Sequence, residues 1–277
     1  MSAAKSTASS RRRVKKSYLF EKVVDSWEDF LQLVSADPFR HWAFRGQRDA
    51  NWQVWSTVSR ELRSRRVASR YWTSQEHRLI WIFQRKVSGF LENLPAVADT
   101  PHWMALMQHH GAPTRLVDFT WSPYVAAFFA LESSVDDAAV WAINAPQLGT
   151  FAYGPEYAKA QRPPSPQDVL NSIGVRGKDG VAIGEPYFKN RRVIAQSGTF
   201  AFPWDIERPI DEILASREGI IAKFVLRGRA LRKRALGELY RMNITNATLF
   251  PDLDGLARSL AFELESHYAY DPTEAEV

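Results

Sequence analysis

One stretch, residues 108–132, constrains the fold more than any other. It reads QHHGAPTRLVDFTWSPYVAAFFALE, so a polar segment runs directly into an apolar one. Ser122 is a good helix cap, Pro123 suits the first helical position, and the apolar residues after them predict a buried helix. A polar loop held by such a helix presents its side chains on a rigid support. We therefore expect functional groups in the loop at residues 112–121.

The composition predicts a packed globular protein. The chain has 277 residues, of which 45% are hydrophobic and 24% are charged, which is enough for one large domain or two small ones. It contains no cysteine, which excludes disulfides, thiolate metal sites and a cysteine nucleophile. No apolar run is long enough to span a bilayer, and the N-terminus lacks an apolar signal segment. We therefore expect a cytoplasmic protein without membrane contact.

The net charge of +5 comes from the N-terminus. Residues 1–16 carry six basic side chains and no acidic one, whereas residues 17–277 carry 30 basic against 31 acidic side chains. We expect residues 1–16 to form a disordered basic tail, which is either solvated or an arm that contacts nucleic acid. The overall charge of the remaining chain does not support a general nucleic-acid-binding surface.

Hydrophobic periodicity predicts both helices and strands. Helices are expected at residues 27–34, 58–70, 73–90, 102–109, 122–132, 229–241 and 252–267. Strands are expected at residues 41–47, 138–144, 191–200, 219–226 and 245–250. Together they predict an α+β fold, a single domain with mixed or antiparallel sheets and flanking helices.

Three segments carry a more specific expectation. Thr73 and Glu76 form a plausible capping box at the start of their helix. Residues 58–70 are basic on one side, which is more typical of a solvated helix face than of a binding groove. Residues 149–186 are rich in proline and glycine, which predicts a surface insertion or a lid.

Polar side chains gather in two separate segments. Arg45 ends a predicted strand directly before Gly46, where a ligand can approach the backbone closely. Thr114 and Arg115 lie in a turn ahead of a helix N-terminus, which favours anions. A guanidinium beside an exposed backbone suits a phosphate next to a planar amide. The alternative is that Arg115 pairs with Asp118 and only orients the loop.

The familiar cofactor and metal motifs are absent from the sequence. There is no GxGxxG, GxxxxGK[ST], HExxH or GxSxG pattern. His109 and His110 are adjacent, so on one helix they point about 100° apart and do not chelate one metal ion together. We therefore expect no metal site.

Four blocks of the sequence resemble the FRG domain, which is named after its Phe-Arg-Gly motif. They are FRGQ at 44–47, QHHGAPTRLVDFT at 108–120 with Ser-Pro at 122–123, RVIAQSGTF at 192–200 and LFPDLDGLA at 249–257. The resemblance implies one FRG-type domain over residues 17–277, with residues 149–186 as an insertion in it.

The layout of these blocks is similar to that of ADP-ribosyltransferases of the arginine–serine–glutamate class. This likeness implies an ADP-ribosyltransferase-like core and NAD as the substrate. Arg45 would match the first motif, and Thr120 with Ser122 would match the second. No Glu-x-Glu strand supplies the third motif, whose carboxylate has four candidates: Glu185, Glu238, Asp252 and Asp254.

The resemblance also implies roles for individual residues. The implied catalytic residues are His109, Thr120 and Asp252. The implied NAD-binding residues are Arg45, Gly46, Gln108, Thr114, Arg115 and Ser122. Cleavage of the nicotinamide–ribose bond passes through an oxocarbenium-like state, which a carboxylate beneath the ribose stabilises. Arg45 would bind the diphosphate, and His109 would orient ribose hydroxyls or act as a base.

The resulting hypothesis is an NAD-dependent ADP-ribosyltransferase-like enzyme. It would transfer ADP-ribose to a protein or nucleic-acid acceptor, as a bacterial toxin or phage-defence effector with an antitoxin or regulatory subunit. One alternative is a non-catalytic module on the same fold that binds a nucleotide or an RNA end through Arg45, Arg115 and the basic tail. Another is a protein-interaction subunit whose cleft is vestigial.

Overall fold

A single seven-stranded mixed sheet organises the protein. The computed structural model describes residues 17–148, 180–185 and 190–266. The strand order is β1-β7-β4-β2-β3-β6-β5. The strands are β1 (Phe20–Val24), β2 (Trp42–Gln47), β3 (Val117–Thr120), β4 (Ala138–Asn144), β5 (Val181–Gly184), β6 (Gly198–Pro203) and β7 (Ile221–Leu226). β1 pairs with β7 in parallel, and the other neighbours are antiparallel. The predicted α+β fold with flanking helices is thus confirmed.

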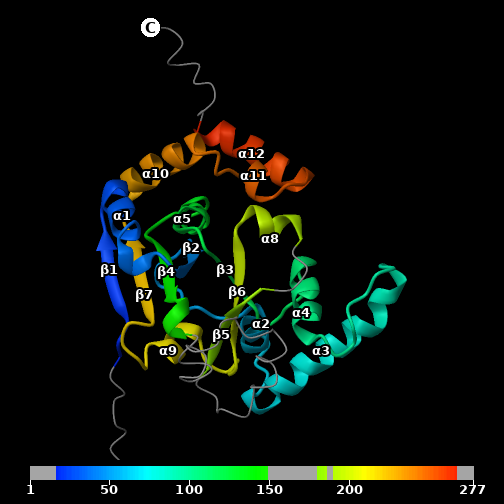
Figure 1. Ribbon diagram of the computed structural model, residues 1–277. Helices are drawn as coiled ribbons and strands as arrows, with labels where there is room; N and C mark the ends of the chain where they lie inside the picture. Colours follow the sequence, from blue (N-terminus) through cyan, green and yellow to red (C-terminus); the bar gives the residue numbers. More distant parts are fainter. Residues whose placement is uncertain (1–16, 149–179, 186–189, 267–277) are drawn as a thin grey trace, which may run out of the picture.

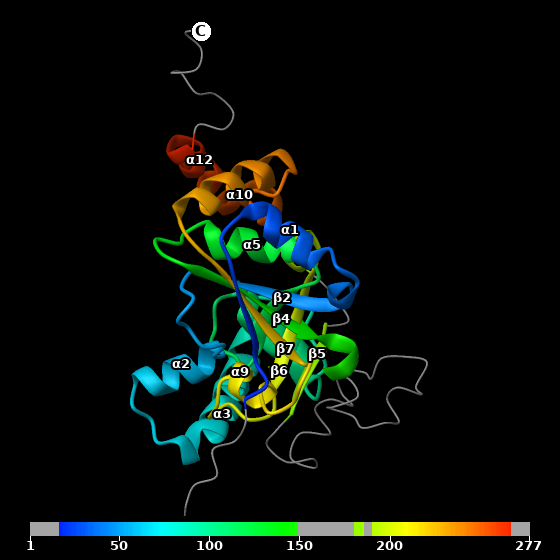
Figure 2. The same cartoon turned by 90° about the vertical axis from the view of Figure 1, so that its left-hand side faces the viewer.

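Helices lie on both sides of this sheet and at one end (Figures 1 and 2). The longer ones are α1 (Trp27–Val34), α2 (Thr57–Ser64), α3 (Trp72–Lys86), α4 (Thr100–His109), α5 (Pro123–Leu131), α10 (Arg229–Arg241) and α12 (Leu253–Ser266). The shorter ones are α8 (Arg191–Ala195), α9 (Ile210–Leu214) and α11 (Asn246–Leu249). Within the described part of the chain, no helix is long and apolar enough to cross a membrane.

Three apolar clusters hold these layers together. The largest joins α1, α5 and α10 to one face of the sheet, with Phe30, Phe44, Phe128 and Phe224 near its centre. A second lies on the opposite face against α9. The third joins α3 and α4 to β5 and β6 through Trp103, Met107 and Phe202 and their neighbours. Because apolar burial stabilises folding roughly in proportion to area, these clusters determine where the helices pack.

Several helix ends are as the sequence predicts. The Ser26 hydroxyl accepts a hydrogen bond from the Asp29 amide at 3.1 Å, and the Ser122 hydroxyl accepts one from the Val125 amide at 3.3 Å. Gly111, just after α4, has a φ of +79°, which glycine adopts without steric cost. The strand at residues 138–144 and the helix at residues 229–241 have the predicted bounds.

Two predicted strands are helices in part. Residues 191–200 begin with α8, which Asn190 caps by accepting from the Val193 amide at 2.8 Å. Residues 245–250 form α11, because Thr245 and Thr248 make a reciprocal capping box. In both cases a short β-branched segment has the composition of a strand, but a side-chain cap stabilises the helical turn instead.

Three other expectations need correction, and a fourth lies largely outside the described residues. The loop expected at residues 112–121 contains β3. The helix expected at residues 58–70 ends at Ser64, and Arg66 follows with a φ of +55°. Glu76 does not cap α3, whose start has no side-chain cap; it is buried and bonds Arg115. In the predicted insertion or lid, residues 180–185 contain the edge strand β5, and residues 149–179 and 186 lie outside the described residues.

The sheet opens between β2 and β3, and this opening positions the site. β2 pairs with β4 along six residues but with β3 only at Phe44 and Thr120. Beyond that pair the Arg45 side chain reaches across, and its Nη1 donates to the Asp118 carbonyl oxygen at 2.7 Å. A long side chain therefore takes the place of further ladder hydrogen bonds, and the strands separate around it.

Candidate functional site

A pocket of about 340 Å³ lies beside this opening. β2, β3, α4, α5, α8 and the end of α11 contribute to it. Its polar lining residues are Arg45, Gln108, His109, Asp118, Thr120, Asn190, Arg192 and Gln196. Its other lining residues are Gly46, Ala105, Phe119, Phe129, Val193, Phe200 and Phe250. The volume is near the lower end of the range for small-molecule sites, about 300–1,000 Å³.

Arg45 is the cation on the sheet side of the pocket. Apart from the bond to Asp118, its guanidinium has no hydrogen-bond partner among the described residues, and its Nε is buried without an acceptor. Burial lowers the pKa of Arg45, the Asp118 charge partly offsets this, and the nearby charge of Arg60 lowers it further. The site thus disfavours an uncompensated guanidinium charge, and a bound anion would stabilise it.

Asp118 supplies a carboxylate to the same pocket, and its position is set by a short chain of hydrogen bonds. The Thr114 hydroxyl donates to the Gln108 side-chain oxygen, so the Gln108 amide directs its Nε2 toward Asp118. That Nε2 donates to Asp118 Oδ1 at 2.7 Å. No hydrogen-bond partner from the described residues reaches Asp118 Oδ2. One carboxylate oxygen is therefore fixed, and the other is free for a ligand.

The lining of the pocket includes a second cation, Arg192 of α8. Its Nη2 donates to Asp252 Oδ2 at 3.2 Å, its guanidinium lies 4.8 Å from the Phe250 ring centroid, and its Nε is buried without an acceptor. Phe129 of α5 meets Phe250 edge-to-face, with ring centroids 5.9 Å apart. The pocket therefore combines two guanidiniums, one free carboxylate oxygen and an aromatic pair.

His109 lies at the C-terminal end of α4, beside Arg192. Partial burial lowers the pKa of His109, the neighbouring His110 and Arg192 charges lower it further, and Asp252 opposes them. Its imidazole is therefore neutral at physiological pH and able to accept a proton or a hydrogen bond. Among the described residues, no group of three or more His, Asp or Glu side chains is arranged to hold a metal ion.

The structure brings together five of the nine predicted site residues. Arg45, Gly46, Gln108, His109 and Thr120 line the pocket. The Thr120 hydroxyl is already engaged, because it donates to the Gln196 carbonyl at 2.7 Å and accepts from the Ser122 amide. Gly46 serves packing: a Cβ there would lie 2.0 Å from the Ala126 oxygen of α5. It lets α5 pack directly on β2, and its expected role in the close approach of a ligand stays a prediction.

The other four predicted residues do not line the pocket. Thr114 acts through Gln108, Ser122 caps α5, and Asp252 accepts from the Gly255 amide and pairs with Arg192. Arg115 differs most from expectation: it is 3% exposed, bonds the Glu76 carboxylate, and donates to the Pro203 and Trp204 carbonyls. Its guanidinium is fully used inside the protein, so neither a role in NAD binding nor the alternative pairing with Asp118 fits its position.

Sequence reasoning did not select Arg192, Gln196, Phe250 or Asp118 as site residues. Arg192, Gln196 and Phe250 lie in the two blocks that resemble the FRG domain near the end of the chain, so that resemblance was the signal that could have found them. For Asp118 the sequence left an internal pair with Arg115 as an alternative. Its true partner, Gln108, was visible in the sequence only as one more polar residue of the same block.

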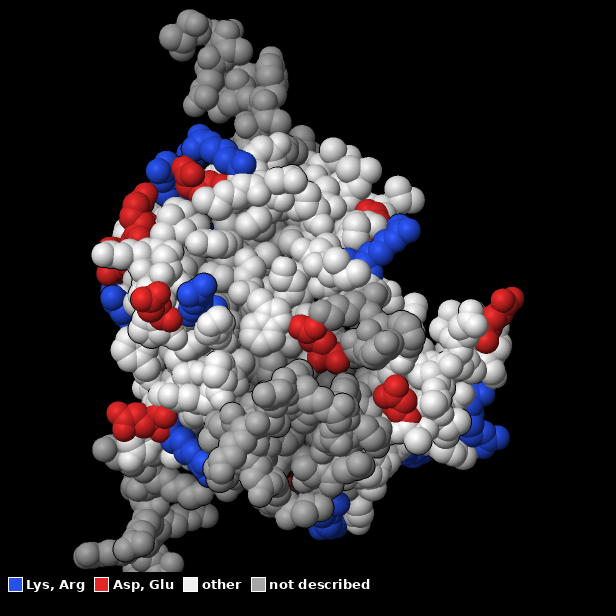
Figure 3. Space-filling view, viewed as in Figure 1, with Lys and Arg blue, Asp and Glu red and all other residues white. Residues whose placement is uncertain are grey.

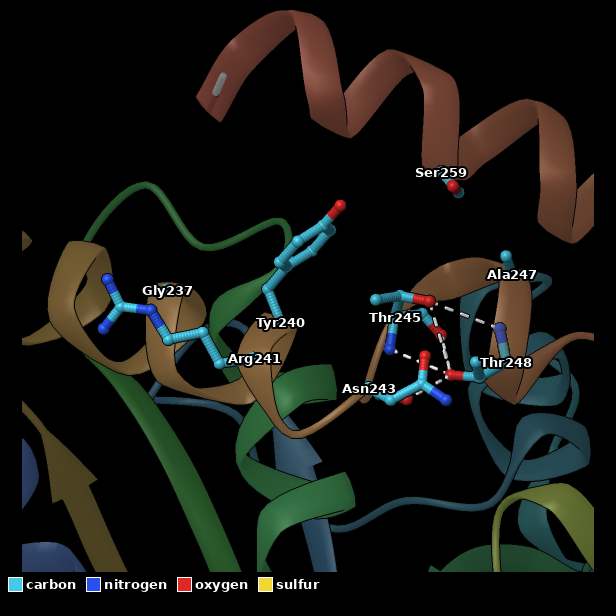
Figure 4. A pocket seen from close by; sticks show the side chains of 8 residues that line it. All are labelled: Gly237, Tyr240, Arg241, Asn243, Thr245, Ala247, Thr248 and Ser259. Atoms are coloured by element: carbon cyan, nitrogen blue, oxygen red, sulfur yellow. Dashed lines mark hydrogen bonds between the residues drawn. The ribbon is translucent and has the colours of Figure 1, made fainter. Parts of the chain in front are cut away.

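A second pocket, of about 520 Å³, lies between α10, α11 and α12 (Figure 4). Its hydroxyls mainly cap α11, since Thr245 and Thr248 bond each other and the backbone around them. Arg241 points away from this threonine cluster in Figure 4, and its Nη1 pairs with Glu238 at 2.9 Å. The lining of this pocket lacks the combination of two guanidiniums and a carboxylate seen in the first one.

Comparison with known proteins identifies one family. Residues 40–139 match the FRG domain family model. The match includes the Phe-Arg-Gly segment and the block at residues 108–123, whereas the blocks at 192–200 and 249–257 lie beyond it. No curated protein and no solved structure matches the chain. The comparisons therefore support an FRG domain over residues 40–139, and a likeness to ADP-ribosyltransferases is not among their matches.

Proposed function

We propose that this protein binds NAD in the pocket beside β3 and transfers ADP-ribose from it to a protein or nucleic-acid acceptor. The observation that carries the proposal is the meeting of Arg45, Arg192 and Asp118 around one cavity. A diphosphate needs cations, and the glycosidic bond of a nucleotide needs a carboxylate to stabilise the charge that develops on the ribose. The aromatic pair supplies the apolar surface that a planar ring requires.

The two guanidiniums have distinct roles in this proposal. Arg45 is held rigidly by its bond to the Asp118 carbonyl and has a pKa lowered by burial, so it gains most from a bound phosphate. The positive charge of Arg192 is partly neutralised by the Asp252 carboxylate, and Arg192 lies on the short helix α8. A ligand phosphate would compete with Asp252 for it. Two cations in the lining of one pocket suit two linked phosphates better than one.

Asp118 is the carboxylate that we assign to the ribose, in place of Asp252. Asp252 is fixed by the Gly255 amide and Arg192 and is absent from the described lining of the pocket. Asp118 has one oxygen held by Gln108 and one oxygen free. In the reaction the bond between ribose C1′ and the nicotinamide nitrogen breaks, and its electron pair leaves with nicotinamide. A bond then forms from C1′ to the acceptor, whose proton passes to neutral His109.

The test measures NAD binding by calorimetry and nicotinamide release in the presence of protein and RNA acceptors. Arg45→Ala is expected to weaken NAD binding, because a charge-assisted hydrogen bond is lost. Asp118→Asn keeps the shape and the contact with Gln108, so it is expected to retain NAD binding while nicotinamide release falls about 100-fold or more. Asp252→Asn is the matched control outside the pocket and is expected to retain most of the release. Wild-type protein that neither binds NAD nor releases nicotinamide would refute the proposal.

A non-catalytic nucleotide-binding module is the second candidate. It is favoured by the modest volume of the pocket, about 340 Å³. In that case Arg45→Ala still weakens nucleotide binding, but wild-type protein releases no nicotinamide and Asp118→Asn leaves nucleotide binding unchanged. The behaviour of the Asp118→Asn variant thus separates the enzyme from the binding module.

A further inference from the structure

The charge of residues 17–277 is unevenly distributed along the sequence. Residues 48–86, which include α2 and α3, carry nine Lys and Arg against three Asp and Glu, whereas the rest of residues 17–277 carries 21 against 28. One of the three acids, Glu76, is buried against Arg115 and adds no negative charge to the surface. Residues 17–277 are therefore nearly neutral overall, but residues 48–86 within them form a local basic surface. Basic groups appear on the lower right-hand edge, over α3, in Figure 3.

Exposed aromatic rings accompany these basic side chains. Trp81, on the outer side of α3, is 55% exposed, and Tyr71, directly before the start of α3, is 49% exposed. The Arg85 guanidinium lies 4.6 Å from the Trp81 ring centroid, and that of Arg70 lies 4.8 Å from the Tyr71 ring centroid. Large exposed aromatics are uncommon on a surface that contacts only water.

Two further pairs of the same kind precede α3. The Arg63 guanidinium lies 4.3 Å from the Trp55 ring centroid, and that of Arg48 lies 5.1 Å from the Trp52 ring centroid. Trp52 is 45% exposed. Four arginine–aromatic pairs therefore occur within residues 48–86. The repeated pairing of arginine with an aromatic ring is a second feature of residues 48–86, independent of their net charge.

The side chains on α3 form one continuous stripe. Tyr71, Arg78, Trp81 and Arg85 are spaced by seven, three and four residues, so they share one face of the helix. From Tyr71 to Arg85 this face is about 20 Å long at 1.5 Å per residue. The opposite face of α3 is buried through Trp72, Glu76 and Ile80. The Glu76–Arg115 pair ties that face to the segment that leads into β3, so the stripe is held on a rigid support.

We propose that the basic–aromatic surface of residues 48–86 binds single-stranded nucleic acid. Guanidiniums bind phosphates, and the exposed ring faces of Trp and Tyr stack on bases of any sequence. An acidic protein or an anionic membrane would use the charge but would have no need for four aromatic faces, each paired with an arginine. The pocket is not part of this surface, so binding here does not depend on the proposed reaction with NAD.

The test is fluorescence anisotropy with short fluorescein-labelled oligo(U) RNA and oligo(dT) DNA. The full-length protein is titrated between about 50 and 200 mM salt. Trp81→Ala is expected to weaken binding about 5- to 100-fold through lost stacking. Replacing both Arg78 and Arg85 by Ala is expected to reduce the salt slope by about 1.4, at 0.7 for each phosphate contact with a single strand.

Matched control variants remove the same kinds of side chain, an aromatic ring or a guanidinium, outside the proposed surface. Phe90→Ala removes an 84% exposed ring beyond α3, and Arg234→Ala removes an exposed guanidinium on α10. Both variants, and Arg45→Ala, are expected to keep the wild-type affinity. A Trp81→Ala/Arg85→Ala protein that binds oligo(U) normally would overturn the proposal, because the N-terminal residues 1–16 would then account for binding. The proposal would also fail if heparin or phosphatidylserine vesicles bound with the same dependence on Trp81.

Discussion

Replacing Arg115 by Met is predicted to destabilise the protein without removing any residue of the pocket. The Arg115 and Glu76 side chains are 4% and 2% exposed, and Arg115 Nε donates to both carboxylate oxygens at 2.9 and 3.0 Å. The variant leaves a buried carboxylate and two backbone carbonyls without a partner. Breaking a buried ion pair costs about 3–5 kcal/mol, a large part of a total stability of about 5–15 kcal/mol.

A double-mutant cycle separates the interaction energy of the Arg115–Glu76 pair from the effect of each single substitution. Glu76→Gln is expected to be destabilising for the same reason, since it leaves a buried guanidinium uncompensated. Arg115→Met/Glu76→Leu removes both charges and is expected to be more stable than Arg115→Met alone. Urea unfolding followed by tryptophan fluorescence measures the free energy of unfolding of each variant. An Arg115→Met variant within about 1 kcal/mol of wild type, or single effects that simply add, would refute this account of the pair.

The same variants test where Arg115 acts. A folded Arg115→Met/Glu76→Leu protein is expected to bind NAD with the wild-type dissociation constant, because neither side chain reaches the pocket. If this protein stays folded and loses NAD binding, Arg115 belongs to the binding site after all. Circular dichroism of the same sample shows whether the fold is retained.

Two further predictions follow from the site. Gly46→Ala is expected to lower the melting temperature by about 6–12 °C, because overpacking against the α5 backbone costs about 3 kcal/mol. Gly89→Ala is the control and is expected to leave the melting temperature unchanged, because a Cβ at Gly89 meets no atom within 4 Å. Equal melting temperatures of the two variants would contradict this reasoning. The pKa of His109 is lowered from 6.5, so the unfolded chain binds its proton first and folding stability falls as the pH drops below about 6.5. Histidine NMR titration should place the His109 midpoint below 6.5, and His109→Gln should remove that component of acid destabilisation.

Local hydrogen bonds explain why some elements could be predicted from the sequence. Ser26 and Ser122 bond amides three residues ahead, and Gly111 ends α4 through its own backbone conformation. The same kind of bond also produced errors. The Thr245–Thr248 capping box and the Asn190 cap stabilise helical turns in segments whose β-branched residues favour strands. Where two local preferences compete, the pattern alone does not decide between them.

The sequence by itself determined the α+β class, the main helix starts and the polar block that contributes Gln108, His109 and Asp118. Only the tertiary structure decided which of these groups act together. Arg115 pairs with Glu76, 39 residues away, and Arg192 faces Arg45 only because β6 lies beside β3 in the sheet. The physical reason is that caps and turns depend on neighbours in the chain, whereas charge partners and the vacant space that forms a pocket depend on which apolar faces are buried together.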